Sequence, residues 1–481
     1  MTAPKAGGAK EDGYAHRIHA WVPVAQLENL ASHPSVRRIR QPFRPFEDAV
    51  GGEGVRATNA SAWLAAGVDG AGVKVAIVDS GFRDYEVRQR NRDLPTSVKT
   101  ADYCGGRLKT ASEHGTVVAE IVHEMAPGAE LHLVCIRTEV SLMRALQYVV
   151  RNGISVANHS ASWFNTSRGD GSGDPTSPDA IVAEARSKGI LWVNSAGNRA
   201  AQHWTGEFTD PDGNGWHNFD VLDEANDFVI PANAVVCGFV RWDQWPVSTQ
   251  DYDLYLFRVP DLTVLGVSDD DQVGEEQPTE GLCYRNDLGV NQRVGFGILK
   301  ADKHGLSIYR SDESRRFDLF TTGGSLRYRV ATSSITEPGS SPSAFAVGAV
   351  CWQDSSLQPY SSRGPTIDGR IKPDVAGPDS TSSASYGAFK DKMCGRSGFP
   401  GTSASSPHVA GAAALVRQAN PTFGPAEIQS FLMRRAIDQG PPGPDNGFGS
   451  GRLDLGMPPA ASSGPSAADA PPARRSALPS Q

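Results

Sequence analysis

The chain has 481 residues, enough for more than one hydrophobic core, because single domains usually run to about 100–200 residues. Its 46 lysines and arginines against 54 aspartates and glutamates give a formal net charge of −8, and this mildly acidic balance argues against nucleic acid as a partner. No apolar run approaches the roughly 18 residues that a membrane-spanning helix needs, so no membrane partner is expected.

Six cysteines, an even number at low density, permit up to three disulfides, and the sequence does not fix their pairing. They are Cys104, Cys135, Cys237, Cys283, Cys351 and Cys394. None has the close paired spacing of a zinc site. Disulfides in an oxidised, secreted protein are favoured over scattered buried thiols. However, Met1–Asp12 is polar and lacks the apolar core of a signal peptide.

The N-terminal segment predicts a strand over Arg17–Pro23, a short helix over Ala25–Ser32 and a second strand over Ser35–Ile39. An exposed linker over Gln41–Gly54 follows. Beyond it, short apolar runs alternate with amphipathic segments, which indicates a parallel sheet with helices on both faces. The expected strands are Val73–Val78, Leu131–Ile136, Ile154–Ala157, Leu191–Asn194 and Ala344–Val350. The expected helices include Ser141–Arg151, Pro178–Lys188, Ala410–Gln418 and Pro425–Arg435.

A carboxylate and an imidazole stand at the ends of two of these elements. Asp79 directly follows the first apolar run, and sites in open α/β sheets form beyond the carboxyl ends of strands. His114 opens an apolar-faced helix, and Gly115 after it is expected to leave one edge of the ring open to a substrate. Taken singly, Asp79 is more often a turn or cap residue, and His114 a surface or capping residue.

A serine stands at the start of a third element, where Gly401-Thr402-Ser403 precedes a stretch of small residues. Thr402 is expected to cap this helix, so that unpaired backbone N–H groups lie beside Ser403. A hydroxyl becomes a good nucleophile when a base takes its proton and a positive pole receives the charge. The other interpretation is a tightly packed helix start, since small residues also serve close packing.

The stretch between Asn198 and Ser343 is much longer than a simple loop. Alternating patterns separated by turn residues predict strands, and therefore an inserted antiparallel β-sandwich. The expected strands are Ala234–Trp242, Tyr252–Val259, Arg293–Lys300, Gly305–Arg310, Arg316–Thr321 and Leu326–Ala331. The insert either guides substrate access or is a stabilising appendage. Met457–Gln481, rich in Pro, Ala and Ser, predicts a disordered tail.

One loop of the insert offers oxygen ligands at alternate positions, as calcium loops do: Asp210, Asp212 and Asn214. Val221 stands where an EF-hand would place its bidentate glutamate, which excludes that loop type. A structural calcium site is one interpretation and a solvated acidic turn is the other. No cofactor is required for the chemistry expected of the chain.

The motifs Asp79-Ser80-Gly81, His114-Gly115-Thr116 and Gly401-Thr402-Ser403, in this chain order, resemble those of the subtilisin-like serine proteases (subtilases, peptidase family S8). The resemblance covers about residues 51–199 and 343–457 and implies a subtilisin-like doubly wound parallel α/β sheet. It implies that Asp79 orients His114, that His114 is general base and then general acid, and that Ser403 is the nucleophile. Asn198 resembles the family's oxyanion-hole asparagine; alone, it would be interpreted as a turn residue.

The same resemblance implies substrate-binding residues in two segments, where a peptide would add to a strand edge. These are Ser160, Ala161 and Ser162, and then Ser195, Ala196 and Gly197. By themselves both segments are ordinary strand and loop. The chain departs from the family pattern at Ala404, at Ser160-Ala161-Ser162 and at Glu113, so the family's specificity is not transferable.

The N-terminal segment resembles the C-terminal half of the family's inhibitory propeptide, with autocleavage in the linker. The alternative is an uncleaved strand packed on the catalytic domain. The expected organisation is a propeptide-like segment and linker, a catalytic domain in two parts around the β-sandwich insert, and a tail. Their boundaries are 1–50, 51–199, 200–342 (the insert), 343–457 and 458–481.

The sequence therefore predicts a serine endopeptidase that acts through an acyl-enzyme, with protein or peptide substrates and its own propeptide as partners. The family resemblance implies secretion. Two alternatives stay open. One is a processing protease of narrow specificity, gated by the insert. The other is a catalytically idle protein that binds peptide or glycan on the same fold.

Overall fold

The computed structural model divides into two compact units, Met1–Asp48 and Ala49–Gln481. The residues it describes are 9–14, 17–36, 39, 52–301, 315–390, 394 and 398–459. In the first unit, β1 (Ala9–Tyr14) pairs antiparallel with β2 (Arg17–Trp21), and a 3₁₀ turn (Val24–Gln26) and α1 (Leu27–Ala31) follow. The strand predicted at Ser35–Ile39 is wrong at its described residues, and 37–38 lie outside them.

A seven-stranded sheet organises the second unit, in the order β17-β16-β7-β6-β3-β5-β4, and every neighbouring pair is parallel. Its strands are β3 (Lys74–Asp79), β4 (Lys99–Asp102), β5 (Glu130–Cys135), β6 (Val156–His159), β7 (Leu191–Ser195), β16 (Phe345–Cys351) and β17 (Val375–Asp379). The five predicted strands are confirmed, with ends shifted by one or two residues, whereas β4 and β17 were not predicted. Parallel strands buried on both faces explain why the sequence shows apolar runs here.

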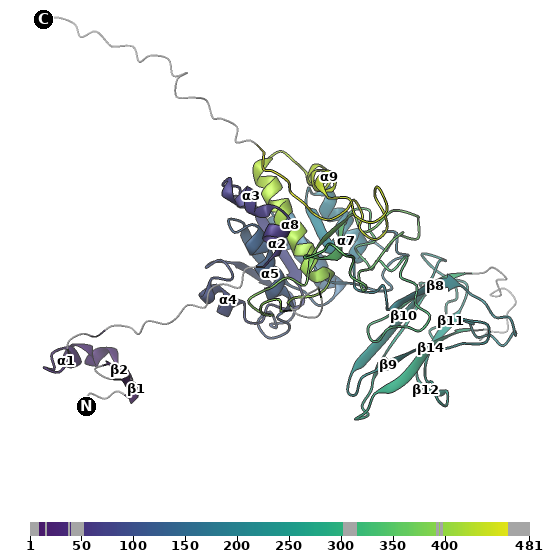
Figure 1. The fold of residues 1–481 in the computed structure, drawn as a ribbon. Coiled ribbons are helices and arrows are strands. Elements are labelled where there is room, and N and C mark those ends of the chain that lie inside the picture. Colours follow the sequence, from purple (N-terminus) through teal and green to yellow (C-terminus); the bar gives the residue numbers. More distant parts are fainter. Residues whose placement is uncertain are drawn as a thin grey trace, which may run out of the picture. The chain divides into compact units, whose positions relative to one another are not determined.

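Helices cover both faces of this sheet, so the expected doubly wound α/β fold is confirmed (Figure 1). Alternate residues of β3 show the division, because Ile77 packs in the core under α5, α8 and α9, while Val78 packs under α6 and α7. The helices are α2 (Gly54–Ala57), α3 (Ala60–Ala65), α4 (Tyr85–Asn91), α5 (His114–Met125), α6 (Glu139–Arg151), α7 (Pro178–Ser187), α8 (Thr402–Ala419) and α9 (Pro425–Arg435).

Two four-stranded antiparallel sheets, β13-β10-β15-β8 and β12-β11-β14-β9, share one aromatic-rich core and form the inserted β-sandwich (Figure 1). Their strands are β8 (His203–Glu207), β9 (Asn226–Ile230), β10 (Val235–Trp242), β11 (Tyr252–Arg258), β12 (Thr263–Ser268), β13 (Thr279–Arg285), β14 (Gln292–Lys300) and β15 (Arg316–Thr321). The strand predicted at Leu326–Ala331 is wrong, because its backbone N–H groups reach separate partners, such as the carbonyl oxygens of Ala201 and His203. The strand predicted at Gly305–Arg310 lies outside the described residues.

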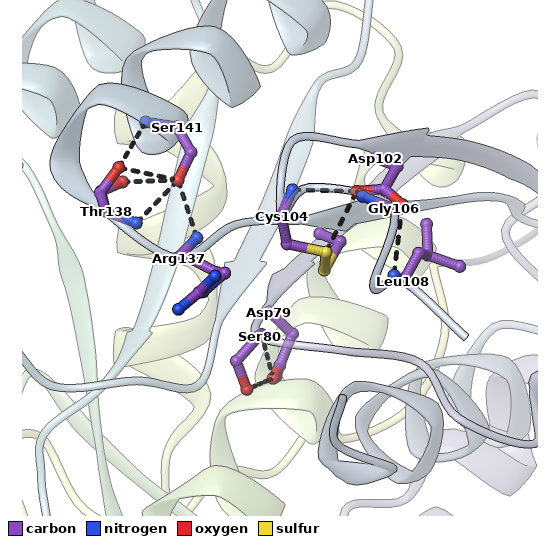
Figure 2. Close-up of a disulfide and its surroundings, with 10 residues drawn as sticks. Asp79, Ser80, Asp102, Cys104, Gly106, Leu108, Arg137, Thr138 and Ser141 are labelled. Atoms are coloured by element: carbon purple, nitrogen blue, oxygen red, sulfur yellow. Dashed lines mark hydrogen bonds between the residues drawn. A yellow bond between two sulfur atoms is a disulfide. The ribbon is translucent and has the colours of Figure 1, made fainter. Parts of the chain in front are cut away.

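All six cysteines form disulfides, the number that the sequence permits. Cys104–Cys135 joins the loop after β4 to the end of β5 (Figure 2). Cys237–Cys283 ties β10 to β13, and Cys351–Cys394 joins the end of β16 to the segment before α8. Among the described residues, no helix combines the length and apolar character needed to cross a membrane.

Candidate active site

Asp79 and His114 meet at the carboxyl edge of the sheet. Asp79 is the last residue of β3 and is 2% exposed, and His114 is the first residue of α5. The His114 Nδ1 and Asp79 Oδ2 atoms are 2.8 Å apart, and Asp79 Oδ1 accepts a hydrogen bond from the Ser80 backbone N–H (2.7 Å; Figure 2). The carboxylate is therefore held by its own turn and fixes the imidazole on its Nδ1 side.

Gly115 has a different role from the one expected. A Cβ atom at this position would lie 2.6 Å from the Gly81 carbonyl oxygen and 2.8 Å from the Asp79 Cβ. Such contacts would force apart the two elements that carry Asp79 and His114. The glycine lets α5 approach β3 closely, so the expectation that it opens one edge of the ring to a substrate is not what the packing indicates.

The pKa of His114 reflects two opposing influences. Partial burial acts to lower the pKa, while the charge of Asp79 and the hydrogen bond to it act to raise it, and the net effect is a pKa above 6.5. The side chain of His114 keeps 28% of its surface exposed. The imidazole thus faces solvent on one side and a buried carboxylate on the other.

Ser403 lies in the first turn of α8. The Gly401 backbone N–H donates to Asp379 Oδ1 (2.6 Å) at the end of β17, which fixes the start of the helix. Ser403 Oγ donates to the carbonyl oxygen of Ser160 (3.2 Å), and in return Ser160 Oγ donates to the Ser403 carbonyl oxygen (3.2 Å). Among the described contacts no hydrogen bond joins Ser403 Oγ to His114.

Asn198 lies against the same helix start. Its Oδ1 atom accepts hydrogen bonds from the Thr402 backbone N–H (2.9 Å) and the Thr402 hydroxyl (3.0 Å). A Cβ atom on Gly401, whose φ is 117°, would lie 3.1 Å from Asn198 Nδ2 and 3.6 Å from the Ser403 backbone nitrogen. The Asn198 amide and the Ser403 backbone N–H are therefore two donors beside one glycine.

The expected cap of this helix is wrong. Gly401 is the N-cap of α8 and offers no side-chain hydrogen bond, while Thr402 is the first helical residue. The Thr402 hydroxyl instead bonds Asn198 and accepts the Gly197 backbone N–H (3.3 Å). The threonine anchors the loop of Asn198 to the helix rather than closing the helix end.

The first predicted substrate-binding segment follows β6, and the second begins at Ser195, the last residue of the neighbouring strand β7. Ala161 and Ser162 are partly exposed after β6, whereas Ser160 is buried. The Ser162 hydroxyl accepts a hydrogen bond from Thr336 Oγ1 (2.8 Å). The second segment is less accessible, because all three of its residues are buried: Ser195, Ala196 and Gly197. Their roles in substrate binding stay a prediction.

Comparison with protein families agrees with this arrangement. The model of the subtilase family, peptidase S8, matches residues 70–225 and 304–451, which is more than half of the chain. The chain belongs to the subtilase family.

Two relatives from Bacillus subtilis match this subtilase over different lengths. The minor extracellular protease Vpr is 24% identical over 417 residues, or 77% of the chain and 49% of Vpr. The serine protease AprX is 32% identical over 138 residues, or 26% of the chain and 31% of AprX. The chain thus spans about half the length of Vpr and less of AprX.

Among solved structures, the CspB protease of Clostridium perfringens resembles this subtilase with a TM-score of 0.56 and 17% identity. The alignment covers 84% of the chain and 97% of the CspB structure. At this level of sequence identity the comparison shows a shared fold and no more.

The subtilase's insert reaches the site through residues that the sequence did not single out. Phe164, two residues after Ser162, stacks on Phe239 of β10, and Arg199, next to Asn198, lies over the Phe164 ring with 5.3 Å to its centroid. Arg199 also donates to the Thr321 carbonyl oxygen (3.3 Å) at the end of β15. The aromatic residues Trp163 and Phe164 directly after Ser162 were the available sequence signal for this contact.

A buried ion cluster lies at the same junction. Arg241 of β10 is 4% exposed and donates to Asp318 of β15 (3.1 Å), to the Ser167 carbonyl oxygen (3.1 Å) and to Glu337. Burial acts to lower the pKa of Arg241, but the charges of Glu337 and Asp318 raise it above its usual value. Arg241 therefore joins the sandwich to Ser167 of the catalytic domain and to Glu337, which lies between the last strand of the sandwich and β16.

The candidate calcium loop uses its oxygens internally. Asp210 accepts the backbone N–H groups of Asn214 (3.1 Å) and Gly215 (2.8 Å), and Asn214 directs its amide N–H groups to Asp212 and Glu224. A cation needs oxygens, not N–H groups, to converge on it, so this arrangement does not fit calcium. Calcium binding stays a prediction, and calorimetric unfolding with and without calcium tests it.

Proposed function

We propose that this subtilase is a serine endopeptidase that hydrolyses peptide bonds through an acyl-enzyme. The 2.8 Å contact between Asp79 and His114 carries the proposal, because a buried carboxylate that holds one ring nitrogen leaves the other to exchange protons. Ser403 lies in the first turn of α8 at the same edge of the sheet and supplies the nucleophile. The relatives' names as proteases support the same activity.

In the first step, the Ser403 side chain turns away from the Ser160 carbonyl oxygen and attacks the carbonyl carbon of the substrate. His114 Nε2 takes the hydroxyl proton, and Asp79 stabilises the resulting imidazolium. The change requires rotation about the Cα–Cβ bond of Ser403. Catalytic hydrogen bonds are often loose before substrate binds, so the present contact with Ser160 is compatible with this role.

The negative charge that develops on the substrate oxygen is received by two donors. Asn198 Nδ2 and the Ser403 backbone N–H both lie near Gly401, and Thr402 holds the Asn198 carboxamide through its oxygen. Donors fixed before the reaction stabilise the oxyanion without reorganising. His114 then returns its proton to the leaving amine, and water hydrolyses the acyl-enzyme by the reverse sequence.

The substrate is a protein or peptide that lies along the partly exposed residues Ala161 and Ser162. The contact of Phe164 with Phe239 favours a second candidate, a processing protease of narrow specificity, because the insert supports the segment next to this edge. Digestion of denatured casein against a set of folded precursor proteins separates the two: broad casein cleavage supports the general endopeptidase.

A fluorophosphonate probe tests the proposed activity directly. We expect covalent labelling of the full chain and none of its Ser403→Ala variant, because only an activated serine reacts rapidly with such a probe. Absence of labelling in the parent, also after removal of residues 1–50, would refute the activity. It would then favour the catalytically idle peptide- or glycan-binding protein on the same fold.

We further propose that the protein is secreted and that Met1–Asp48 is a propeptide. Three disulfides suit an oxidising compartment, and the division between Met1–Asp48 and Ala49–Gln481 suits cleavage in the linker. N-terminal sequencing of the protein recovered from culture medium tests both. A mature N-terminus within Gln41–Gly54 is the expected result, whereas an intact, cell-retained chain contradicts it.

A further inference from the structure

A pocket of about 330 Å³ adjoins the Asp79–His114 pair. Its lining residues come from three loops at the carboxyl edge of the sheet: Ser80, Arg107, Ala111, Ser112 and Arg137. Ser80 directly follows Asp79, and the Ser112 hydroxyl accepts the His114 backbone N–H (3.0 Å). A group held in this pocket therefore lies next to the proposed reacting residues.

A disulfide and backbone hydrogen bonds fix the loops that carry the two arginines, and Figure 2 shows these bonds around Asp102 and Arg137. The disulfide Cys104–Cys135 ties the loop of Arg107 to the strand that precedes Arg137. Asp102 accepts the backbone N–H groups of Cys104 (2.9 Å), Gly106 (3.3 Å) and Leu108 (3.2 Å), and Ser141 accepts that of Arg137 (2.7 Å). A pocket that is ordered before its ligand arrives loses less entropy on binding.

Among the described residues, no carboxylate forms an ion pair with either arginine of this pocket. Arg107 and Arg137 are both exposed, and neither forms an ion pair within the part of the chain that the structure describes. Three carboxylates next to the lining residues have other partners: Glu113 pairs with Arg83 (3.2 Å), Asp102 accepts backbone N–H groups and Asp79 holds His114. Two arginines that form no ion pair with any described residue therefore line one pocket.

We propose that Arg107 and Arg137 bind the carboxylate of an acidic substrate side chain, so that peptides with Glu or Asp within three residues of the cleaved bond are preferred. The guanidinium fork matches a carboxylate in shape and charge, and the pocket has room for a glutamate side chain. The proposal rests on the proposed peptidase function, because the ligand arrives as part of the substrate. It assigns a specificity that the family resemblance does not.

Peptide series test the proposal in the full chain. Internally quenched peptides of one sequence carry Glu, Gln or Lys at each of three positions on either side of the cleaved bond. At one position we expect kcat/KM for Glu to exceed that for Gln by about tenfold, with Lys poorer still, as for a charge-assisted hydrogen bond in a partly open site. Raising the salt concentration should reduce this ratio.

Charge reversal gives the sharper result. The double variant Arg107→Glu/Arg137→Glu should prefer Lys over Glu at that position, whereas Arg151→Glu, an exposed arginine at the far end of α6, should keep the wild-type order. Circular dichroism and Tm establish that the variants are folded. Equal cleavage of the Glu, Gln and Lys peptides at all positions by wild-type protein overturns the proposal.

A binding measurement separates this proposal from the proposed activity. The Ser403→Ala variant is titrated with the same labelled peptides, and fluorescence anisotropy gives Kd. Tighter binding of the Glu peptide by about tenfold supports the pocket even where no cleavage is detected. Equal Kd values for Glu and Gln peptides, together with fluorophosphonate labelling of the parent, overturn the pocket and leave the peptidase proposal standing.

Discussion

Phe164 of the catalytic domain and Phe239 of the insert lie face to face, with ring centroids 4.9 Å apart and planes 4° from parallel. Phe164 belongs to the segment that leaves β6 through Ser160, whose carbonyl oxygen contacts Ser403. Arg199, the neighbour of Asn198, also lies over the Phe164 ring, 5.3 Å from its centroid. The insert therefore supports the two loops that carry the proposed substrate edge and the proposed oxyanion donor.

Phe239→Ala should weaken catalysis by removing this support. We expect kcat/KM to fall about fivefold, comparable to the roughly 1 kcal/mol of an aromatic pair. Phe257→Ala is the matched control, because Phe257 is also half-buried and stacks on Tyr255 in the other sheet. Peptide cleavage and Tm are measured for both. An equal loss of kcat/KM in the two variants would mean that the stack contributes only stability.

Arg241→Met should lower the free energy of unfolding by about 3–5 kcal/mol, because Asp318 and Glu337 would stay buried without their cation. The exposed pair Arg258–Asp261 supplies the control, and Arg258→Met should change the free energy of unfolding far less, because solvent screens this pair. Urea unfolding measures both. Similar losses in the two variants would show that the buried cluster is no more important than a surface pair.

The pH dependence of kcat/KM should be set by the protonation of His114, with the neutral form active. Asp79 raises the pKa of His114 above 6.5, and the base must be neutral, so kcat/KM should rise with pH through that raised value. Asp79→Asn should lower kcat by about 10⁴-fold and move the acid limb of the residual activity to lower pH. A profile whose acid limb stays unchanged in Asp79→Asn contradicts the assignment.

Asn198→Ala should lower kcat by about 100- to 1,000-fold and change KM little, because the lost hydrogen bond forms with the oxyanion and not with the bound substrate. Fluorophosphonate labelling should slow in parallel. Steady-state kinetics on one peptide measures the separate effects of the substitution on kcat and on KM. A rise in KM with kcat preserved would make Asn198 a residue that binds the substrate instead.

Folding stability should fall as the pH rises from about 4.5 to 8. Burial raises the pKa of Glu124 on α5 to about 8 and that of Glu120 to about 7. Between the unfolded-state pKa near 4.5 and these raised values, the folded chain holds protons that the unfolded chain has released, so the free energy of unfolding falls as the pH rises across this interval.

Glu124→Gln should remove much of this slope, on the order of 3 kcal/mol between pH 5 and 9, while its amide oxygen still accepts the Gly52 N–H. Glu184→Gln, at an exposed position of α7, is the control. Chemical unfolding across this pH range provides the measurement. Parallel pH profiles for wild type and Glu124→Gln would contradict the inferred protonation.

The parallel sheet was predictable from sequence because strands buried on both faces form uninterrupted apolar runs, such as Val73–Val78. The motif residues Asp79 and His114 were predictable for a related reason, since both stand where such an element ends or begins. The contact of Asp79 with His114 is what the structure adds to those motifs.

Other features depend on distant segments and leave little local trace. Short strands such as β12 and β13 lie at sheet edges, where polar and apolar residues do not alternate clearly. Arg241 looks like an outward-facing strand residue until Glu337 is placed beside it. Likewise, the pocket of Arg107 and Arg137 forms because the loops that follow β3, β4 and β5 meet at one edge of the sheet.

The two ends of the insert lie side by side where the chain leaves and rejoins the catalytic domain. Ala201, just before β8, accepts a hydrogen bond from the Leu326 backbone N–H (3.1 Å), just after β15. A chain that lacked everything between these residues would need only a short bridge to continue. The sandwich is thus a separable insertion in the path of the chain, and the contacts of Phe239 and Arg241 couple it to the catalytic domain.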